Sequence, residues 1–370
     1  MKDDGRLSKT SEALKRRINN YSQLDLKDKF MFWADFLIRN AIYIIIIMVV
    51  IYVQVYSIQR GFSNRFLSFR SIADIMMRSA SALFLALGVG GIIVLTGTDL
   101  SAGRIMGFTA CVSASLLQMP LEQYSVKMFP DMTAPPIILV LLLTMAIGAL
   151  FGVFNGFCTA KFKLHPFIVT LATQLILYGL VLIYVQLGTN GGGPISGLTE
   201  DYKNVVKYTI DIGGTAIPLY VFYAIIAVFI MWFIWNKTTL GKNMYAVGAN
   251  PEAANVSGIS VMKTTILIFM MGGILYGLSG FIEAARIGSN SPATGLNAEL
   301  DAIAACVIGG VSFTGGTGKI SGIVTGVILL NIISVALQWL GVSGDIQFII
   351  KGAIILVAVA IDMRKYLAKK

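Results

Sequence analysis

The sequence predicts an all-α polytopic membrane protein with about ten transmembrane helices. Residues of the types Ala, Val, Ile, Leu, Met, Phe, Trp, Tyr and Cys make up 56% of its 370 residues. Charged residues make up 13%, against about 25% in ordinary globular chains. The mean hydropathy is +0.77. Because 56% of 370 is about 207 apolar residues, there is material for roughly ten spans of about 20 residues each.

The same composition excludes several other classes. The apolar runs are long and continuous, whereas a transmembrane β-barrel has short alternating segments. The three cysteines lie in separate apolar runs and His165 is the single histidine, so we expect neither disulfides nor a metal site. The net charge of +10 is interpreted as a sign of membrane topology, and we expect no nucleic-acid partner and no cofactor.

The spans follow a polar tail of mixed charge, residues 1–40, which lacks the cleavage site of a signal peptide. We expect this tail to be cytoplasmic, a transmembrane domain over 41–363, and a short basic tail over 364–370. One span begins at Pro166, which suits the first turn of a helix. The expected spans are 42–57, 80–96, 105–119, 136–160, 166–187, 219–235, 264–282, 302–313, 320–339 and 346–361.

Counting basic residues gives an orientation. With the N-terminus inside, 20 of the 29 Lys and Arg residues fall on the cytoplasmic side, which favours two cytoplasmic termini. A basic cluster from Arg60 to Arg78 falls on the outer side, and nothing in the sequence explains it.

The longest cytoplasmic loop, residues 236–263, is polar but contains stretches compatible with helices. A loop of this length with structure of its own is usually functional, so we interpret it as a docking element rather than a plain connector. Within it, Asn250 is expected to cap a short helix, Pro251 to take its first position, and Glu252 to favour the helix dipole.

A second polar segment, residues 97–104, joins two apolar runs with almost no loop. Asp99 and Ser101 are both candidates to cap the following helix, and Gly97 and Gly103 permit tight backbone turns. Two interpretations stay open: a broken helix that faces a polar cavity, and a tight cytoplasmic turn.

Ionisable groups inside spans are costly, so each one needs a reason. Glu283 and Arg286 are spaced to form a structural pair, and Glu299 and Asp301 open the next span. Lys351 is expected to face Asp345 or the outer interface. Five uncharged polar residues also fall within spans, and two roles stay open for them, hydrogen bonds to a polyhydroxylated solute and hydrogen bonds to neighbouring helices: Asn155, Gln174, Gln186, Asn331 and Gln338.

The glycine-rich run 309–319 lacks the spacing of a phosphate-binding loop. We therefore expect no ATP-hydrolysing module and no enzymatic activity in this chain. The run is interpreted as a bend between two spans.

Three segments resemble the membrane permeases of sugar-type ABC importers, the branch that handles ribose, xylose and galactose. They are Thr-Gly-Thr-Asp-Leu-Ser-Ala-Gly-Arg at 96–104, the cytoplasmic segment 241–258, and Leu-Asp-Ala-Ile-Ala-Ala-Cys-Val-Ile-Gly-Gly-Val-Ser-Phe at 300–313. The resemblance covers nearly all of 36–366. Within the family, the Thr-Asp-Leu-Ser-Ala-Gly-Arg form is most similar to the galactose/methyl galactoside branch.

The resemblance implies a ten-helix importer fold in the bacterial inner membrane, whose halves form an inverted repeat around the sixth span. It implies a second copy of the chain, cytoplasmic ABC ATPase subunits, and a periplasmic or lipid-anchored sugar-binding protein as partners. Residues implied to contact the ATPase are Gly241, Lys242, Tyr245, Gly248, Asn250, Pro251, Glu252, Ala253, Ser257 and Gly258. The pathway and motif residues expected are Thr96, Gly97, Thr98, Asp99, Ser101, Gly103, Asn155 and Gln338.

Three alternatives remain at this point. A permease for nucleosides or for another pentose or hexose has a related sequence. A secondary transporter driven by ions would use Asp99 or Glu283 to carry the coupling proton or cation. A channel or membrane scaffold would need no ATPase at all.

Overall fold

The computed structural model describes residues 41–61, 65–121 and 126–367, so the predicted tail 1–40 lies outside the described residues. The chain divides into two units, residues 1–52 and 53–370. Of the first unit, the structure describes the beginning of α3 (Ala41–Gln59). Every contact discussed below lies within the second unit.

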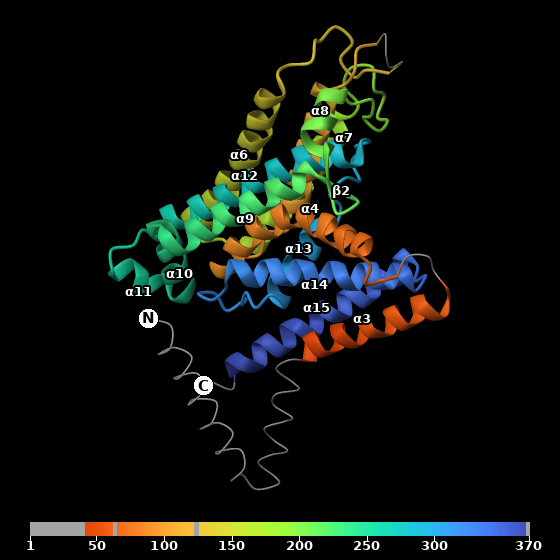
Figure 1. Cartoon of the computed structure of the whole chain (residues 1–370). Helices are drawn as coiled ribbons and strands as arrows, with labels where there is room; N and C mark the ends of the chain where they lie inside the picture. Colours follow the sequence, from red (N-terminus) through yellow and green to blue (C-terminus); the bar gives the residue numbers. More distant parts are fainter. Residues whose placement is uncertain (1–40, 62–64, 122–125, 368–370) are drawn as a thin grey trace, which may run out of the picture. The chain divides into compact units, whose positions relative to one another are not determined.

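The second unit is almost entirely helical (Figure 1). Its first helices are α4 (Phe69–Val94), α5 (Ala102–Leu116), α6 (Ile137–Phe162) and α7 (Pro166–Tyr184). The middle elements are α8 (Glu200–Lys207), β1 (Thr209–Ile212), β2 (Thr215–Pro218), α9 (Leu219–Lys237), α10 (Thr239–Ala249) and α11 (Pro251–Val256). The last helices are α12 (Val261–Ile287), α13 (Ala298–Ile308), α14 (Ile320–Trp339) and α15 (Gly344–Leu367).

Each of the ten predicted apolar runs overlaps a helix. Six helices among the described residues are both long and apolar enough to cross a bilayer: α4, α6, α7, α9, α12 and α14. By contrast, α5 has 15 residues and α13 has 11, and a helix of 15 residues spans roughly 22 Å of a hydrocarbon core about 30 Å thick. The chain is thus a multi-pass membrane protein, and the count of ten crossings stays a prediction.

The core of the bundle is α12, which packs against α4, α5 and α6. Glycines on α6 let its backbone approach α12 closely. A Cβ atom added to Gly148 would collide with the backbone of Gly273, and one added to Gly152 would collide with the backbone of Phe269. Small residues at such a contact replace the hydrophobic driving force that lipid cannot supply, because they allow extensive van der Waals packing.

The two halves of the bundle repeat one arrangement. The 26-residue α4 is followed by a short break and the short α5, and the 27-residue α12 is followed by a break and the short α13. Each break contains a non-glycine residue with positive φ, Thr96 at 61° and Asn297 at 62°. Two further long helices follow each short one.

A small ordered segment joins the halves. The strands β1 and β2 pair antiparallel, with Thr209 opposite Pro218, around a two-residue turn of Gly213 and Gly214. Both glycines have positive φ, as tight hairpin turns of this kind require. On the preceding α8, the buried Tyr202 donates a hydrogen bond to the Phe281 carbonyl of α12. Burial raises the pKa of Tyr202, so its phenol remains a donor.

Candidate functional site

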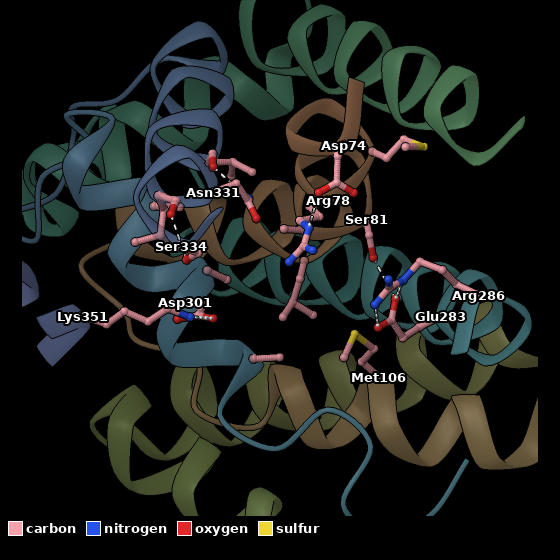
Figure 2. Close-up of a pocket in the computed structure, with 18 of the residues that line it drawn as sticks. Asp74, Arg78, Ser81, Met106, Glu283, Arg286, Asp301, Asn331, Ser334 and Lys351 are labelled. Carbon is pink, nitrogen blue, oxygen red and sulfur yellow. Dashed lines mark hydrogen bonds and ion pairs between the residues drawn. The ribbon is translucent and has the colours of Figure 1, made fainter. Parts of the chain in front are cut away.

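The bundle contains a cavity of about 550 Å³ that is lined by charged and polar side chains (Figure 2). Its walls come mainly from α4, α12, α13, α14 and α15, with contributions from Met106 of α5 and Tyr220 of α9. This volume lies within the range of about 300–1,000 Å³ that is typical of small-molecule pockets.

Three ion pairs line the cavity. Asp74 and Arg78 pair along α4 at 3.1 Å, one helical turn apart. Glu283 and Arg286 pair along α12 through two contacts of 2.5 and 2.7 Å, as the sequence predicted. The third pair joins two helices: Lys351 of α15 donates to Asp301 of α13 at 2.8 Å. The cavity therefore carries three acidic and three basic groups that compensate one another.

Two of these pairs differ from the expectations. Lys351 was expected to face Asp345 or the outer interface, and instead it contacts Asp301. Arg78 belonged to the unexplained basic cluster, and its pairing with Asp74 in the cavity accounts for its place in an apolar helix. The Glu283 carboxylate also accepts a hydrogen bond of 2.8 Å from Ser81, which ties α12 to α4.

A stripe of uncharged polar residues runs along the cavity face of α14. Asn331, Ser334 and Gln338 follow a spacing of three and four residues, which places them on one face of a helix. Asn331 donates to the Val327 carbonyl at 2.9 Å, and Ser334 donates to the Leu330 carbonyl at 3.0 Å. These hydrogen bonds within α14 satisfy some of the donors of the stripe, while its other polar groups remain available at the cavity wall.

The predicted pathway motif, residues 96–104, forms a different kind of structure. Asp99 is 1% exposed, and its carboxylate accepts from the backbone N–H of Ser101 at 2.9 Å and from the Ser101 hydroxyl at 2.6 Å. Ser101 occupies the N-cap position of α5, but its side chain makes no capping hydrogen bond. The capping role predicted for both residues is thus replaced by a bond between them.

This motif is fastened to α6 and α7 by further buried side chains. Asn155 of α6 donates to the Ser101 hydroxyl at 2.9 Å and accepts from Thr173 of α7 at 2.6 Å. Thr170 of α7 contacts the break from both sides, since it donates to the Thr98 carbonyl and accepts from Leu100, each at 3.1 Å. We call Asp99, Ser101, Asn155, Thr170 and Thr173 the buried network.

The glycines of the motif serve close packing. A Cβ atom on Gly97 would lie 2.9 Å from the Ile92 side chain, and one on Gly103 would collide with Glu299 at the start of α13. Thr96 adopts the left-handed backbone conformation noted above. Of the eight predicted pathway and motif residues, Gln338 lines the cavity, whereas Asp99, Ser101 and Asn155 belong to the buried network.

The sequence did not single out Asp74, Ser81 or Ser334, and it marked Arg78 only as part of the unexplained basic cluster. These residues come from helices that are distant in the sequence, so no contiguous motif marks them. The available signals were the acid–base spacing within α4 and the polar stripe of α14, both inside otherwise apolar runs.

The predicted docking segment forms two helices, α10 and α11. Asn250 caps α11 by accepting from the Ala253 N–H at 3.0 Å, Pro251 opens the helix, and Glu252 lies in its first turn. All three details agree with the sequence-based prediction. The exposed members of the predicted set are Lys242, Asn250, Pro251, Glu252, Ala253, Ser257 and Gly258.

The other predicted residues fix this segment to the bundle. Gly241 permits the tight turn after α9, and a Cβ atom on Gly248 would collide with the Val94 carbonyl at the end of α4. Tyr245 donates to the Gly318 carbonyl of the 309–319 bend at 2.9 Å. Burial raises the pKa of Tyr245, which keeps the phenol protonated as a donor. Movement of α10 would therefore reach α4 directly.

Comparison with known proteins gives a consistent result. The family model described as the permease component of a branched-chain amino acid transport system matches residues 71–359. The chain is 46% identical over 305 residues to the galactose/methyl galactoside import permease of Escherichia coli K12, covering 82% of this chain and 90% of that protein. Identity to the Haemophilus influenzae protein of the same name is 42% over 336 residues, covering 91% and 97%.

A ribose import permease of Escherichia coli K12 is 32% identical over 303 residues, which cover 82% of this chain and 88% of that protein. No solved structure matches the chain. Within the described ranges, His, Cys, Asp and Glu side chains nowhere gather in groups of three that could hold a metal ion.

Proposed function

The chain belongs to the family of permease components typified by the branched-chain amino acid transport system, and we propose that it is the membrane-spanning subunit of an ATP-driven importer for galactose or methyl galactosides. This proposal is supported by the difference in sequence identity between two sets of relatives. Relatives named as galactose/methyl galactoside permeases reach 42–46%, whereas those named as ribose permeases reach 32–33%.

The proposed assembly contains two copies of the chain, cytoplasmic ABC ATPase subunits and an external sugar-binding protein. The ATPase docks on α10 and α11. The exposed first turn of α11 and the close packing of α10 against the end of α4 support this role. ATP binding would draw the ATPase subunits together, push on α10, and rock the helices between outward-open and inward-open states.

The proposed topology has ten crossings with both termini in the cytoplasm. The repeated order of long and short helices supports two halves related as an inverted repeat, with α9 as the sixth span. The excess of Lys and Arg on the cytoplasmic side, 20 of 29, supports the orientation. Short helices that end at a break inside the bundle are tolerated where protein, not lipid, surrounds them.

The experiment that tests this function is uptake of labelled galactose by proteoliposomes. They would contain the chain and its ATPase, with the binding protein outside and ATP inside. We expect uptake that requires ATP and persists when ion gradients are collapsed. Uptake without ATP that follows a proton or sodium gradient would instead establish a secondary transporter, and ribose or nucleoside uptake without galactose uptake would reassign the substrate.

Docking of the ATPase is tested by Glu252→Arg. The reversal places a positive charge at the exposed first turn of α11, so we expect loss of ATPase co-purification while the chain still inserts. Glu200→Arg is the matched control, because Glu200 is an exposed first-turn glutamate on α8. Equal ATPase binding by the wild type and Glu252→Arg would contradict docking at α11.

A further inference from the structure

We propose that the ion-paired cavity is a transient binding chamber for a neutral, hydroxyl-rich solute, and that its three ion pairs and the α14 stripe are the groups that the solute hydroxyls contact. This inference rests on the proposed transport function and deepens it by assigning the solute-contacting residues. The predicted motif at 96–104 is left with a role in holding the helices together.

A second hollow lies beside the cavity. It has a volume of about 530 Å³ and is lined by Ser68, Arg70, Gly214 and Trp339, at the start of α4, the hairpin turn and the end of α14. Asp74 and Met77 line both hollows, so the two adjoin at α4. In the proposed orientation the hairpin is external, and a solute released outside would reach the chamber past Asp74.

The charges of the chamber select against charged solutes. Each of the three carboxylates is already paired with a cation of the protein at 3.1 Å or less. An amino acid would need an unpaired anion for its ammonium group and an unpaired cation for its carboxylate, and it would have to break protein pairs to obtain them. The chamber therefore disfavours the substrate class in the family model's description.

A sugar hydroxyl has no such requirement. A carboxylate offers about four acceptor positions and a guanidinium offers five N–H donors, more than one ion pair uses. A hydroxyl both donates and accepts, so it can join a pair such as Glu283–Arg286 without separating it. The stripe of Asn331, Ser334 and Gln338 supplies further donors and acceptors along one wall.

The same geometry predicts weak binding. Asn331 and Ser334 are hydrogen-bonded to α14 itself, and Glu283 is bonded to Arg286 and Ser81, before any solute arrives. A hydrogen bond exchanged between satisfied groups contributes little net free energy, so the solute would not be trapped. Weak binding suits a chamber through which the solute passes, because in the proposed assembly the external binding protein captures the solute.

Substitutions on the stripe test the chamber in the complete importer. We expect Asn331→Leu to lower galactose uptake about tenfold while ATP hydrolysis stimulated by the binding protein persists, because leucine would leave a desolvated solute hydroxyl without a partner, which costs more than the exchange of one hydrogen bond for another. Gln174→Leu is the matched control: Gln174 is an uncharged polar residue of a span, on α7, and it does not line the cavity. Equal uptake by the wild type and Asn331→Leu would overturn the inference.

The pair between helices gives a second test. Asp301→Asn leaves Lys351 without its partner in the chamber, and we expect uptake to fall about tenfold or more. The exchanged variant Asp301→Lys with Lys351→Asp restores the pair and should recover most of the uptake. Loss in the single variant without recovery in the exchanged one, at equal expression and thermal stability, would contradict a role for the pair itself.

Chemical labelling locates the solute directly. In a Cys158→Ser background, Ser334→Cys would be labelled with a small thiol reagent during turnover with binding protein and ATP; Cys111 and Cys306 are buried. We expect galactose to slow labelling and leucine to leave it unchanged. Protection by neither compound, in a variant that transports galactose, would overturn the chamber, whereas absence of ATP-dependent uptake by the wild type would overturn the proposed function instead.

Discussion

Two regions of the bundle hold carboxylate side chains in opposite ways. In the buried network, Asp99 is 1% exposed and is bonded to the backbone and hydroxyl of Ser101, two residues away. In the cavity, Asp74, Glu283 and Asp301 are paired with basic side chains around an open volume of about 550 Å³. One region seals its polar groups from any solute, and the other presents them to one.

Polar side chains within spans therefore have two distinct uses. The buried network joins the break after α4 to α6 and α7, so its polar groups position helices. The cavity pairs mostly join residues of one helix, and their outer lone pairs and N–H groups face the space between helices. Variants in the first region should therefore change folding, and variants in the second should change transport.

The largest expected effect concerns the packing that supports the buried network. Gly148→Ala places a methyl group against the backbone of Gly273 and forces α6, which carries Asn155, away from α12. We expect a loss of stability of at least about 1–3 kcal/mol and little folded protein. Gly179→Ala on α7 has open space around the new methyl group, and it should leave stability equal or raise it by about 0.5–1 kcal/mol.

Fluorescence size-exclusion chromatography and thermal unfolding in detergent measure both glycine variants. Similar profiles for Gly148→Ala and Gly179→Ala would show that the close approach of α6 to α12 does not determine stability, and would weaken the contrast between the two regions.

The second prediction compares one aspartate variant from each region by unfolding temperature and by galactose uptake. Asp99→Ala leaves the buried N–H and O–H of Ser101 without their acceptor, so we expect a loss of about 1–3 kcal/mol and a lower unfolding temperature. Asp74→Ala removes a half-exposed pair, so the unfolding temperature should barely change while galactose uptake falls.

Both aspartate variants are measured by thermal unfolding and by ATP-driven uptake normalised to folded protein. If Asp99→Ala unfolds at the wild-type temperature, or if Asp74→Ala transports at the wild-type rate, the assignment of the two regions is wrong.

A smaller effect is expected where the cytoplasmic segment meets the bundle. Tyr245→Phe removes the hydrogen bond from α10 to the Gly318 carbonyl, and we expect uptake per ATP hydrolysed to fall about two- to fivefold with little loss of stability. Tyr223→Phe is the matched control, because Tyr223 also donates to a backbone carbonyl at 2.9 Å, but outside α10 and α11. If Tyr245→Phe and Tyr223→Phe show the same uptake per ATP hydrolysed, the Tyr245 hydrogen bond has no part in coupling ATP hydrolysis to transport.

The helices were largely predictable from the sequence because apolar runs mark them. The beginnings at Pro166, Leu219 and Ile320 agree with the prediction to the residue. The prediction for α4 began at residue 80, whereas the helix begins at Phe69. Its first turns carry Asp74 and Arg78, which line the cavity. Because both side chains are charged, they lower the local hydropathy and make the apolar run begin later than the helix.

The site was less predictable because its residues are contiguous only in space. The motif at 96–104 is conspicuous in the sequence, and its Asp99 and Ser101 are buried and hydrogen-bonded to each other, whereas the cavity takes one or a few residues from each of several helices. The pairing of Glu283 with Arg286 follows from local spacing and was predicted. The pairing of Asp301 with Lys351 spans 50 residues, and nothing in local periodicity specifies it.

The smallest expected effect tests redundancy within the cavity. Ser81 donates at 2.8 Å to a Glu283 oxygen that also accepts from Arg286 at 2.7 Å, so Ser81→Ala leaves that carboxylate paired. We expect uptake to fall about twofold, with an unchanged unfolding temperature, because one of several hydrogen bonds is lost. Ser79→Ala is the matched control on α4, since the Ser79 hydroxyl bonds to the Ile75 carbonyl of its own helix. A fall in uptake of tenfold or more for Ser81→Ala would mean that the contact between α4 and α12, and not the ion pair, sets the arrangement of the cavity wall.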